Sequence, residues 1–221
     1  MIEYALGSGV EAFSTTRDSV LPYNVVTGHQ VHGVGIAVVD RPDITRDELQ
    51  GYDALVTGLE GVAIGVRTAD CVPLLLYDPE ARVIAAVHSG WRGTAGRIVQ
   101  KVIGRMCGGF SASASRIRAV IGPAILEEAF QVGGDVVSAF RIAGFDMDRI
   151  CRWTGMPEAG SMKGGYHIDL AAANELLLLE SGVEARNIYS CGICTYSDSR
   201  FFSARREGAA CGRIINSIKM V

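Results

Sequence analysis

Two short apolar runs, each followed by a side chain that can bind a metal, constrain the fold of this chain more than any other feature. Residues 62–66 precede the segment Thr68-Ala69-Asp70-Cys71, and residues 83–87 lead directly into His88. A near-continuous apolar run such as 83–87 is typical of a strand that is buried on both faces. We therefore expect two strands that each present a soft metal ligand at the carboxyl end.

A third candidate ligand lies upstream, in the segment Gln30-Val31-His32-Gly33. One thiolate, from Cys71, and two imidazoles, from His32 and His88, suit a zinc or a copper ion. Three protein ligands would leave a fourth position for water or substrate, as in catalytic sites. The alternative is three separate structural residues, because their spacing matches no zinc-finger rule and a lone buried cysteine is commonly an inert small hydrophobe.

Composition favours an ordinary globular enzyme or binding protein. The chain has 221 residues, is 48% hydrophobic and has a formal net charge of −3, so we expect one domain over residues 1–221 and no nucleic-acid partner. No apolar run is long enough to span a bilayer, which requires about 18 residues, and no signal peptide is visible. We therefore expect a cytoplasmic protein without a membrane partner, whose six cysteines are reduced thiols.

The order of predicted elements indicates an α+β fold. Strands and helices are interspersed without strict βαβ alternation, which favours mixed sheets covered by helices. Residues 29–39 are expected to contain a strand that includes His32. Pro73 is expected to interrupt the strand ladder after the cysteine segment. Residues 153–165 contain several glycines and are predicted to form a loop.

Apolar residues at helical spacing predict an amphipathic helix over about residues 94–106, which Gly108-Gly109 would end. Asp135 is the expected N-cap of a short helix that follows it. Asp169 is the expected N-cap of a helix over residues 170–180, whose alanine and leucine content favours helix.

A Cys-x-x-Cys motif, Cys191 to Cys194, could in principle carry redox or zinc chemistry. We discount it because it lies within a predicted strand over residues 188–193, where positions three apart face opposite sides.

The three ligand segments, QVHG, TADC and HSGWRG, resemble in this order the YfiH-like family, also called the laccase-domain or polyphenol-oxidase-like family. The resemblance extends from about residue 14 to the C-terminus. Four further segments agree with it: IGPAI at 121–125, FQVG at 130–133, HIDL at 167–170 and CTYSDSRFFSARR at 194–206.

The resemblance implies a layered α/β/β/α sandwich and metal ligands at His32, Cys71 and His88. It also implies an enzyme, a zinc-dependent purine nucleoside phosphorylase, with adenosine deaminase as a side activity. Its substrates would be a purine nucleoside, adenosine or inosine, and phosphate, and its products the free base and ribose 1-phosphate.

Four further residues are candidates for the site. Asp70 would either accept backbone N–H groups in its turn or orient a ligand histidine, in which case it belongs to the catalytic group. Arg92 stands at the start of the predicted helix between two glycines, where a phosphate could bind, although an exposed arginine at a helix start is the alternative. Arg17, in a segment that resembles the STR segment of the family, and Arg205 are the other candidates for phosphate binding.

The chain also departs from the family pattern. Only residues 24–29 separate its Pro-Tyr turn from QVHG, where members carry about thirty residues that include an arginine-bearing helix. Gln131 and Ala204 replace a common glutamate and tyrosine, and Arg67 adds a charge before TADC. A neighbouring subunit of a homo-oligomer could replace the missing pocket wall.

Two other functions compete with the phosphorylase reading. A copper polyphenol oxidase is the older interpretation of the family, but the four histidines of this chain are too few for several coppers. The third interpretation is a metal-stabilised, non-catalytic binding protein or a peptidoglycan-related accessory factor, an alternative that the shortened N-terminal region leaves open.

Overall fold

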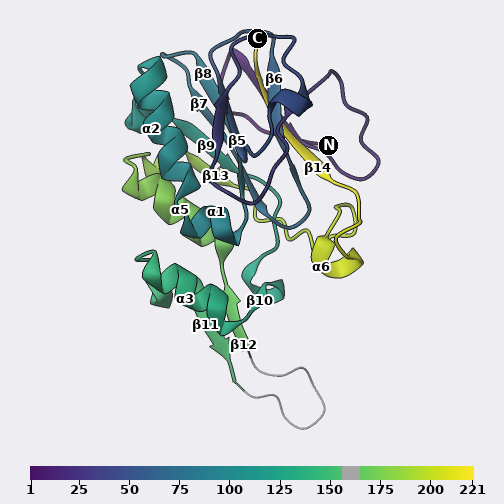
Figure 1. The fold of residues 1–221 in the computed structure, drawn as a ribbon, viewed down its shortest axis with the longest axis vertical. Helices are drawn as coiled ribbons and strands as arrows, with labels where there is room; N and C mark the ends of the chain where they lie inside the picture. Colours follow the sequence, from purple (N-terminus) through teal and green to yellow (C-terminus); the bar gives the residue numbers. More distant parts are fainter. Residues whose placement is uncertain (156–164) are drawn as a thin grey trace.

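The computed structural model describes residues 1–155 and 165–221, and its centre is a six-stranded mixed sheet (Figure 1). Its strands in spatial order are β13 (Ile188–Ser190), β9 (Arg118–Ile121), β7 (Val72–Asp78), β8 (Val83–Ser89), β5 (Ala54–Thr57) and β4 (Ile36–Val38). The two outer pairs are parallel and the inner pairs are antiparallel. Every residue of β7 and β8 is buried, as the apolar run at 83–87 indicated.

A five-stranded sheet lies against one face of the six-stranded sheet. Its strands in spatial order are β1 (Ile2–Glu3), β2 (Val10–Ser14), β14 (Ile214–Met220), β6 (Ala63–Thr68) and β3 (Val26–Thr27). The last strand of the chain, β14, is the central one and pairs antiparallel with both β2 and β6. The shortened connection before QVHG contributes the edge strand β3, which is parallel to β6.

Helices cover the other face of the six-stranded sheet (Figure 1). The described α-helices are α1 (Trp91–Ala95), α2 (Ile98–Phe110), α3 (Gly134–Ile142), α4 (Met147–Ile150), α5 (Leu170–Glu180) and α6 (Ala204–Glu207). Short 3₁₀ turns are η1 (Arg46–Glu48), η2 (Ala114–Arg116), η3 (Glu127–Ala129) and η4 (Ala185–Asn187). No helix in the described part of the chain is long and apolar enough to cross a membrane.

The alternation of side chains along the central strands builds two hydrophobic clusters, one on each face. Leu74 and Leu76 point toward the helices, whereas Leu75 and Tyr77 point toward the five-stranded sheet. The order of layers is therefore helices, six-stranded sheet and five-stranded sheet. The expected α+β fold with mixed sheets and covering helices is confirmed, and one domain over residues 1–221 stays a prediction.

A small antiparallel sheet projects from the main body beside α3 (Figure 1). It consists of β10 (Gln131–Val132), β12 (Gly165–Ile168) and β11 (Cys151–Thr154). The predicted loop over residues 153–165 therefore begins and ends within strands, and the rest of it lies outside the described residues.

The predicted helix over residues 94–106 is wrong in extent. The chain forms two helices, because Arg97 adopts a left-handed conformation with φ of 59° between α1 and α2. The second helix also continues through Gly108 and Gly109 to Phe110. Tertiary packing overrides the weak helix propensity of glycine here, since the inward face of α2 is fully buried.

Of the two predicted helix N-caps, one is confirmed and one is wrong. Asp169 is the N-cap of α5 and accepts a hydrogen bond from the backbone of Ala172, as expected. Asp135 instead lies in the first turn of α3, whose N-cap is Gly133 without a side-chain bond. Its carboxylate still lies near the positive end of the helix, where a negative charge is favourable.

Three expectations about strands also need correction. His32 is not in a strand but in a turn before β4, with φ of 61°. Pro73 does not interrupt the ladder, because it lies within β7 opposite His88. Strand β13 ends at Ser190, so Cys191 and Cys194 follow it rather than lie within it. All six cysteines are free.

Candidate metal centre

Three side chains that could bind one metal ion converge at one end of the sheets. His32 projects from the turn before β4, Cys71 lies between β6 and β7, and His88 is near the end of β8. Their ligand atoms all lie within 4.8 Å of one another. The two imidazole rings meet edge to face, with centroids 4.8 Å apart. His32 is exposed, Cys71 is half-buried and His88 is buried, so the cluster forms the floor of an opening to solvent.

A buried aspartate that the sequence did not reveal, Asp53, holds two of the three ligands. Its carboxylate Oδ1 lies 2.8 Å from Nδ1 of His88 and accepts the backbone N–H of His32 at 2.9 Å. Oδ2 accepts the backbone N–H groups of Val31 at 3.2 Å and Gly33 at 2.8 Å. These bonds stabilise the left-handed backbone of His32. When Nδ1 of His88 carries the proton toward Asp53, Nε2 is left as the metal-binding atom.

Charge within the cluster favours a thiolate. Burial opposes ionisation of Cys71, but hydrogen bonds with His32 and His88 outweigh it and lower the pKa of the thiol to about 6. Burial likewise opposes protonation of His88, yet Asp53 and Cys71 raise the pKa of this imidazole to about 9. Both shifts favour transfer of the thiol proton toward His88, and a metal ion would take the place of that proton.

Gly90 leaves the space that a metal ion would require. A Cβ atom at this position would lie 3.0 Å from Sγ of Cys71 and 3.3 Å from Cδ2 of His32. Its φ is −70°, which any residue can adopt. The glycine is therefore required by the close approach of the ligands and not by backbone conformation.

The donor set and its size fit a single soft or borderline ion. Zinc binds histidine nitrogen and cysteine sulfur at about 2.0–2.3 Å, so at a tetrahedral angle two ligand atoms lie about 3.3–3.8 Å apart. The ligand atoms here lie within 4.8 Å of one another and must approach more closely to bind the ion, which rotation of the exposed His32 side chain allows. A carboxylate behind the buried histidine is the arrangement that orients metal-bound imidazoles in many zinc proteins. Copper accepts the same ligands.

Comparison with known proteins identifies the family. Residues 12–221 match the family described as multi-copper polyphenol oxidoreductase laccase. This chain belongs to that family. The resemblance to YfiH-like laccase-domain proteins is therefore confirmed, and it extends over nearly the whole chain.

Relatives in the laccase-domain family carry two enzymatic names. The chain is 38% identical over 252 residues to adenosine deaminase RL5 from an unknown prokaryotic organism, covering 95% of this chain and 94% of the relative. It is 40% identical over 226 residues to a purine nucleoside phosphorylase of Bacteroides thetaiotaomicron, covering 96% and 82%. The crystal structure of YlmD from Geobacillus stearothermophilus superposes with a TM-score of 0.83 at 28% identity, covering 98% and 94%.

Asp70, the aspartate beside the cysteine in the laccase-domain TADC segment, bonds to the C-terminal segment. Its carboxylate accepts the hydroxyl of Thr195 at 2.7 Å and the backbone N–H of Arg205 at 2.7 Å. Its backbone is left-handed, with φ of 95°, and its carbonyl accepts the N–H of Ile125. These bonds fix the turn that carries Cys71. A catalytic role for Asp70 stays a prediction.

The three arginines proposed from the sequence for phosphate binding have different partners in the structure. Arg17 pairs with Glu207, and its guanidinium also donates to the carbonyls of Ser199 and Phe201. Arg205 donates to the carbonyls of Ala129 and Gln131.

Arg92 is exposed and stacks on Trp91, with its Cζ atom 4.2 Å from the ring centroid. The guanidinium of Arg92 forms no hydrogen bond or ion pair with the described residues. Phosphate binding at these three positions stays a prediction.

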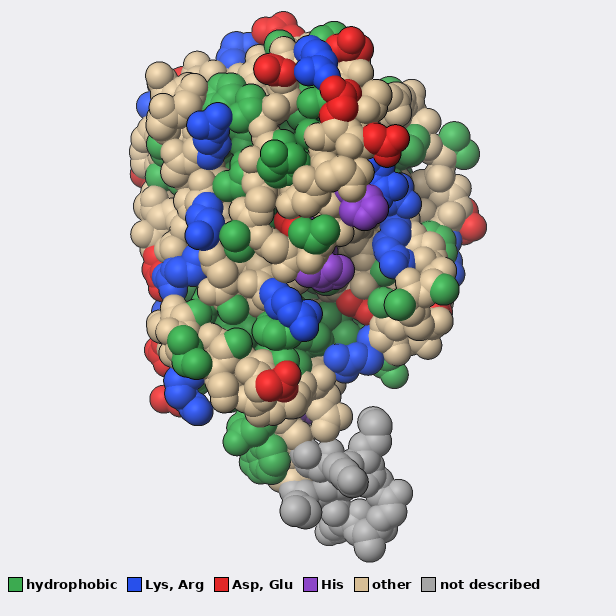
Figure 2. All heavy atoms as spheres, viewed as in Figure 1, with side chains coloured by type: hydrophobic (Ala, Val, Ile, Leu, Met, Phe, Trp, Pro, Cys, Tyr) green, Lys and Arg blue, Asp and Glu red, His purple; other side chains and the backbone are tan. Residues whose placement is uncertain are grey.

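A cavity of about 330 Å³ opens directly beside the metal ligands. Three other arginines line it: Arg46 from η1, Arg67 from β6 and Arg213, which precedes β14. The space-filling view shows basic side chains gathered beside histidines on this face (Figure 2). Arg67 could be noticed in the sequence as a departure before TADC, but no sequence pattern indicated Arg46 or Arg213, because the three arginines come from distant segments.

Proposed function

We propose that this protein is a zinc-dependent purine nucleoside phosphorylase that converts adenosine or inosine and phosphate into the free base and ribose 1-phosphate. The observation that carries the proposal is the cluster of His32, Cys71 and His88 beside an open cavity. A relative that is 40% identical over almost the whole chain and named purine nucleoside phosphorylase supports the reaction class.

The roles of the cluster follow from its hydrogen bonds. His32, Cys71 and His88 would hold the zinc, and Asp53 would keep Nδ1 of His88 protonated so that Nε2 faces the ion. Bound zinc supplies Lewis acidity, which polarises a substrate oxygen or lowers the pKa of water toward about 7. Asp70 would keep Cys71 in place through its bonds to the C-terminal segment.

Phosphorolysis forms one bond and breaks one bond at the same carbon. An oxygen of phosphate attacks the anomeric carbon of the ribose, while the bond from this carbon to the purine nitrogen breaks. The electron pair of the broken bond stays on the base, which takes up a proton. The protein must therefore bind a dianion and a neutral nucleoside side by side and exclude bulk water from the anomeric carbon.

Chromatography of a reaction with adenosine tests the proposal. Zinc-loaded protein is incubated with adenosine, with and without phosphate, beside Cys71→Ala and the matched control Cys151→Ala, a half-buried cysteine on β11. We expect adenine only with phosphate, unchanged in Cys151→Ala and absent in Cys71→Ala. The absence of product from any purine nucleoside, in protein shown to contain its metal, would favour the non-catalytic reading.

Deamination of adenosine is the second candidate activity, because the relative that is 38% identical is named adenosine deaminase RL5. Water activated at the same centre would attack the purine ring and release ammonia. Inosine that forms without phosphate and disappears in Cys71→Ala would establish it. Metal analysis of the same samples addresses the copper oxidase reading, since several coppers per chain would contradict the zinc proposal.

A further inference from the structure

The cavity beside the metal ligands has an unusual concentration of positive charge. Arg46 is exposed, whereas Arg67 and Arg213 are half-buried. Burial, followed by like-charge repulsion from Arg46 and Arg213, lowers the pKa of the Arg67 guanidinium. All three arginines line the same cavity.

None of the described residues that line the cavity is acidic, and the three arginines form no ion pair with the described residues. The carboxylate of Asp53 lies behind His88, to which it is bonded, and not in the lining of the cavity. Most other arginines near the C-terminal segment are paired, as Arg17 is with Glu207 and Arg200 with Asp198. A zinc ion with one thiolate ligand would add a further net positive charge. Such a site is electrostatically unfavourable until an anion enters it.

Two of the three arginines are held by backbone carbonyls, and all three keep free donors. Arg213 donates to the backbone carbonyls of Ala209 at 2.8 Å and Gly212 at 3.0 Å, and also to that of Cys211. Arg46 donates from Nε to the carbonyl of Gly28 at 3.5 Å. The guanidinium of Arg67 bonds to none of the described residues. Since each guanidinium has five N–H donors, donors remain for a ligand at all three positions.

The backbone of Arg67 is tied to the segment that carries a metal ligand. The side-chain amide of Gln30 donates to the carbonyl of Arg67 and accepts its N–H, both at 2.8 Å. Gln30 precedes His32 by two residues. On another wall of the cavity, Ala204 replaces the tyrosine expected from the family pattern and leaves room for a ligand.

We propose that Arg46, Arg67 and Arg213 form a subsite that binds a phosphoryl group next to the metal centre. Guanidinium groups bind phosphate oxygens in pairs, and several of them around one cavity match the charge of a phosphate dianion. The proposal rests on the proposed function, for which it names the groups that bind phosphate. The phosphoryl group is supplied either as inorganic phosphate or as the 5′-phosphate of a purine nucleotide.

Calorimetric titration of the zinc-loaded protein tests the subsite without relying on turnover. Inorganic phosphate and, separately, adenosine 5′-monophosphate are titrated into the native protein, Arg67→Gln and Arg213→Gln. Arg105→Gln, which removes one exposed charge on α2, is the matched control. We expect the Kd for phosphate to rise at least about tenfold in each cavity variant and less than about twofold in the control.

The two ligands distinguish the two sources of the phosphoryl group. Competition between adenosine 5′-monophosphate and phosphate, both weakened in Arg67→Gln, would support a subsite open to nucleotides. Binding of phosphate alone would support a subsite for the inorganic ion. Native affinity of Arg67→Gln and Arg213→Gln for both ligands would overturn the proposal.

Thermal unfolding in phosphate-free buffer separates ligand binding from a structural role. Removal of one of three repelling charges should leave the Tm of Arg67→Gln equal to or above that of the native protein, and its zinc content unchanged. A lower Tm with unchanged phosphate affinity would show a structural arginine and contradict the subsite. If Arg67→Gln does not fold, Arg67→Lys keeps the charge but loses paired bonding, and native phosphate affinity in that variant would overturn the proposal.

Failure of the subsite and failure of the phosphorylase give different results. Weakened phosphate binding in Arg67→Gln, with no adenine formed by the native protein, would leave the subsite standing and contradict the phosphorylase. Adenine formed by Arg67→Gln with the native KM for phosphate would contradict the subsite and leave the phosphorylase standing.

Discussion

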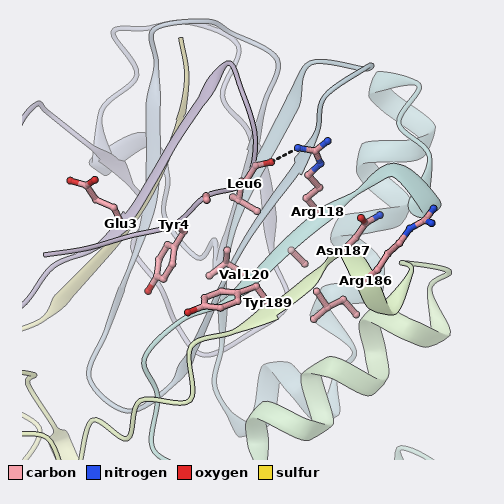
Figure 3. A pocket seen from close by; sticks show the side chains of 11 residues that line it. Glu3, Tyr4, Leu6, Arg118, Val120, Arg186, Asn187 and Tyr189 are labelled. Carbon is pink, nitrogen blue, oxygen red and sulfur yellow. Dashed lines mark hydrogen bonds between the residues drawn. The ribbon is translucent and has the colours of Figure 1, made fainter.

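Two cavities of this molecule differ in size and in chemistry, and the smaller one has the chemistry of an active site. A cavity of about 630 Å³ lies between the N-terminal segment and the strands β9 and β13 (Figure 3). In it the side chain of Arg118 donates to the carbonyl of Leu6 at 2.8 Å, and the rings of Tyr4 and Tyr189 lie 6.3 Å apart. The cavity beside the metal ligands is about half this volume.

The difference lies in the charges and donors that each cavity offers. The larger one contains Glu3 as well as Arg118 and Arg186, so opposite charges are present, and none of its described lining residues is a histidine or cysteine. The smaller one combines a thiolate, two imidazoles and three arginines without a carboxylate. Convergent, charged and metal-binding groups therefore locate the candidate site better than volume does.

Removal of the metal ligands should produce the largest difference between the two cavities in zinc content and activity. We expect the double variant Cys71→Ser/His88→Ala to lose its zinc and to lower kcat/KM by on the order of a thousandfold, because a metal supplies several kcal/mol of transition-state stabilisation. Tyr189→Ala in the larger cavity should leave both unchanged. Elemental analysis and the adenosine assay measure the two quantities, and full zinc retention by the double variant would refute the ligand assignment.

The next largest effect should be a difference in zinc affinity between variants of the two buried aspartates near the cluster, Asp53 and Asp70. Asp53→Asn removes the negative charge and replaces one of the two acceptor oxygens by an NH2 donor, so the side chain can no longer accept from His88 and His32 with one oxygen and from Val31 and Gly33 with the other; we expect zinc affinity to fall about 10–100-fold. Asp70→Asn should leave zinc affinity within a few-fold of native, because Asp70 bonds to Thr195 and Arg205 instead. Competition with a chromophoric chelator measures both. Equal losses in the two variants would contradict the assigned role of Asp53.

A methyl group at Gly90 should have a smaller effect on the same centre. We expect Gly90→Ala to weaken zinc binding by about tenfold, because its Cβ would lie 3.0 Å from Sγ of Cys71 and would displace it. Gly104→Ala on α2 is the control, since a Cβ there meets no atom within 4 Å and should stabilise the helix by about 1 kcal/mol. Chelator competition and thermal unfolding distinguish the two, and native zinc affinity in Gly90→Ala would show that the ligands can adjust.

The smallest expected effect is on stability and concerns Arg17. Unlike the arginines of the cavity, Arg17 forms an ion pair, with Glu207. Hydrogen bonds from Arg17 and Arg206, of which the bond from Arg17 is the stronger cause, lower the pKa of Glu207 to about 2. Since the folded-state pKa lies below the unfolded one, the pair stabilises the fold fully above about pH 4.5 and loses this effect as the pH falls toward 2.

Unfolding of the native protein and Glu207→Gln between pH 2 and pH 7 measures this contribution. We expect a small difference in stability at neutral pH, because the pair is partly exposed. The difference should disappear near pH 2, where Glu207 becomes protonated. A difference that is independent of pH would show that the ion pair is not its cause.

The sequence predicted most reliably those elements whose residues are constrained on all sides. Strand β8 and helix α5 lie where their apolar runs and the cap at Asp169 indicated. The convergence of His32, Cys71 and His88 could be predicted from the family resemblance of their three segments, and metal binding there stays a prediction. The break at Arg97 could not, since it depends on how two helices pack against one sheet.

Residues that are brought together by the pairing of distant strands could not be predicted from the sequence. Asp53 meets His88 because β5 pairs antiparallel with β8, and no local pattern specifies that register. Arg67 and Arg213 lie together because β6 pairs with β14. Arg17 was a reasonable candidate for phosphate binding by motif, but its pairing with Glu207 became visible only in three dimensions.

The position of β14 has a consequence for the order of events during folding. This strand is the last of the chain in sequence and the middle one of its sheet. The five-stranded sheet can therefore form only after β14 has paired with β2, near the other end of the chain, and with β6. Contacts between such distant segments form slowly, because the entropy of closing a long loop must be overcome first. We therefore expect the cavity wall that carries Arg213 to be completed after the strands that present the metal ligands have paired.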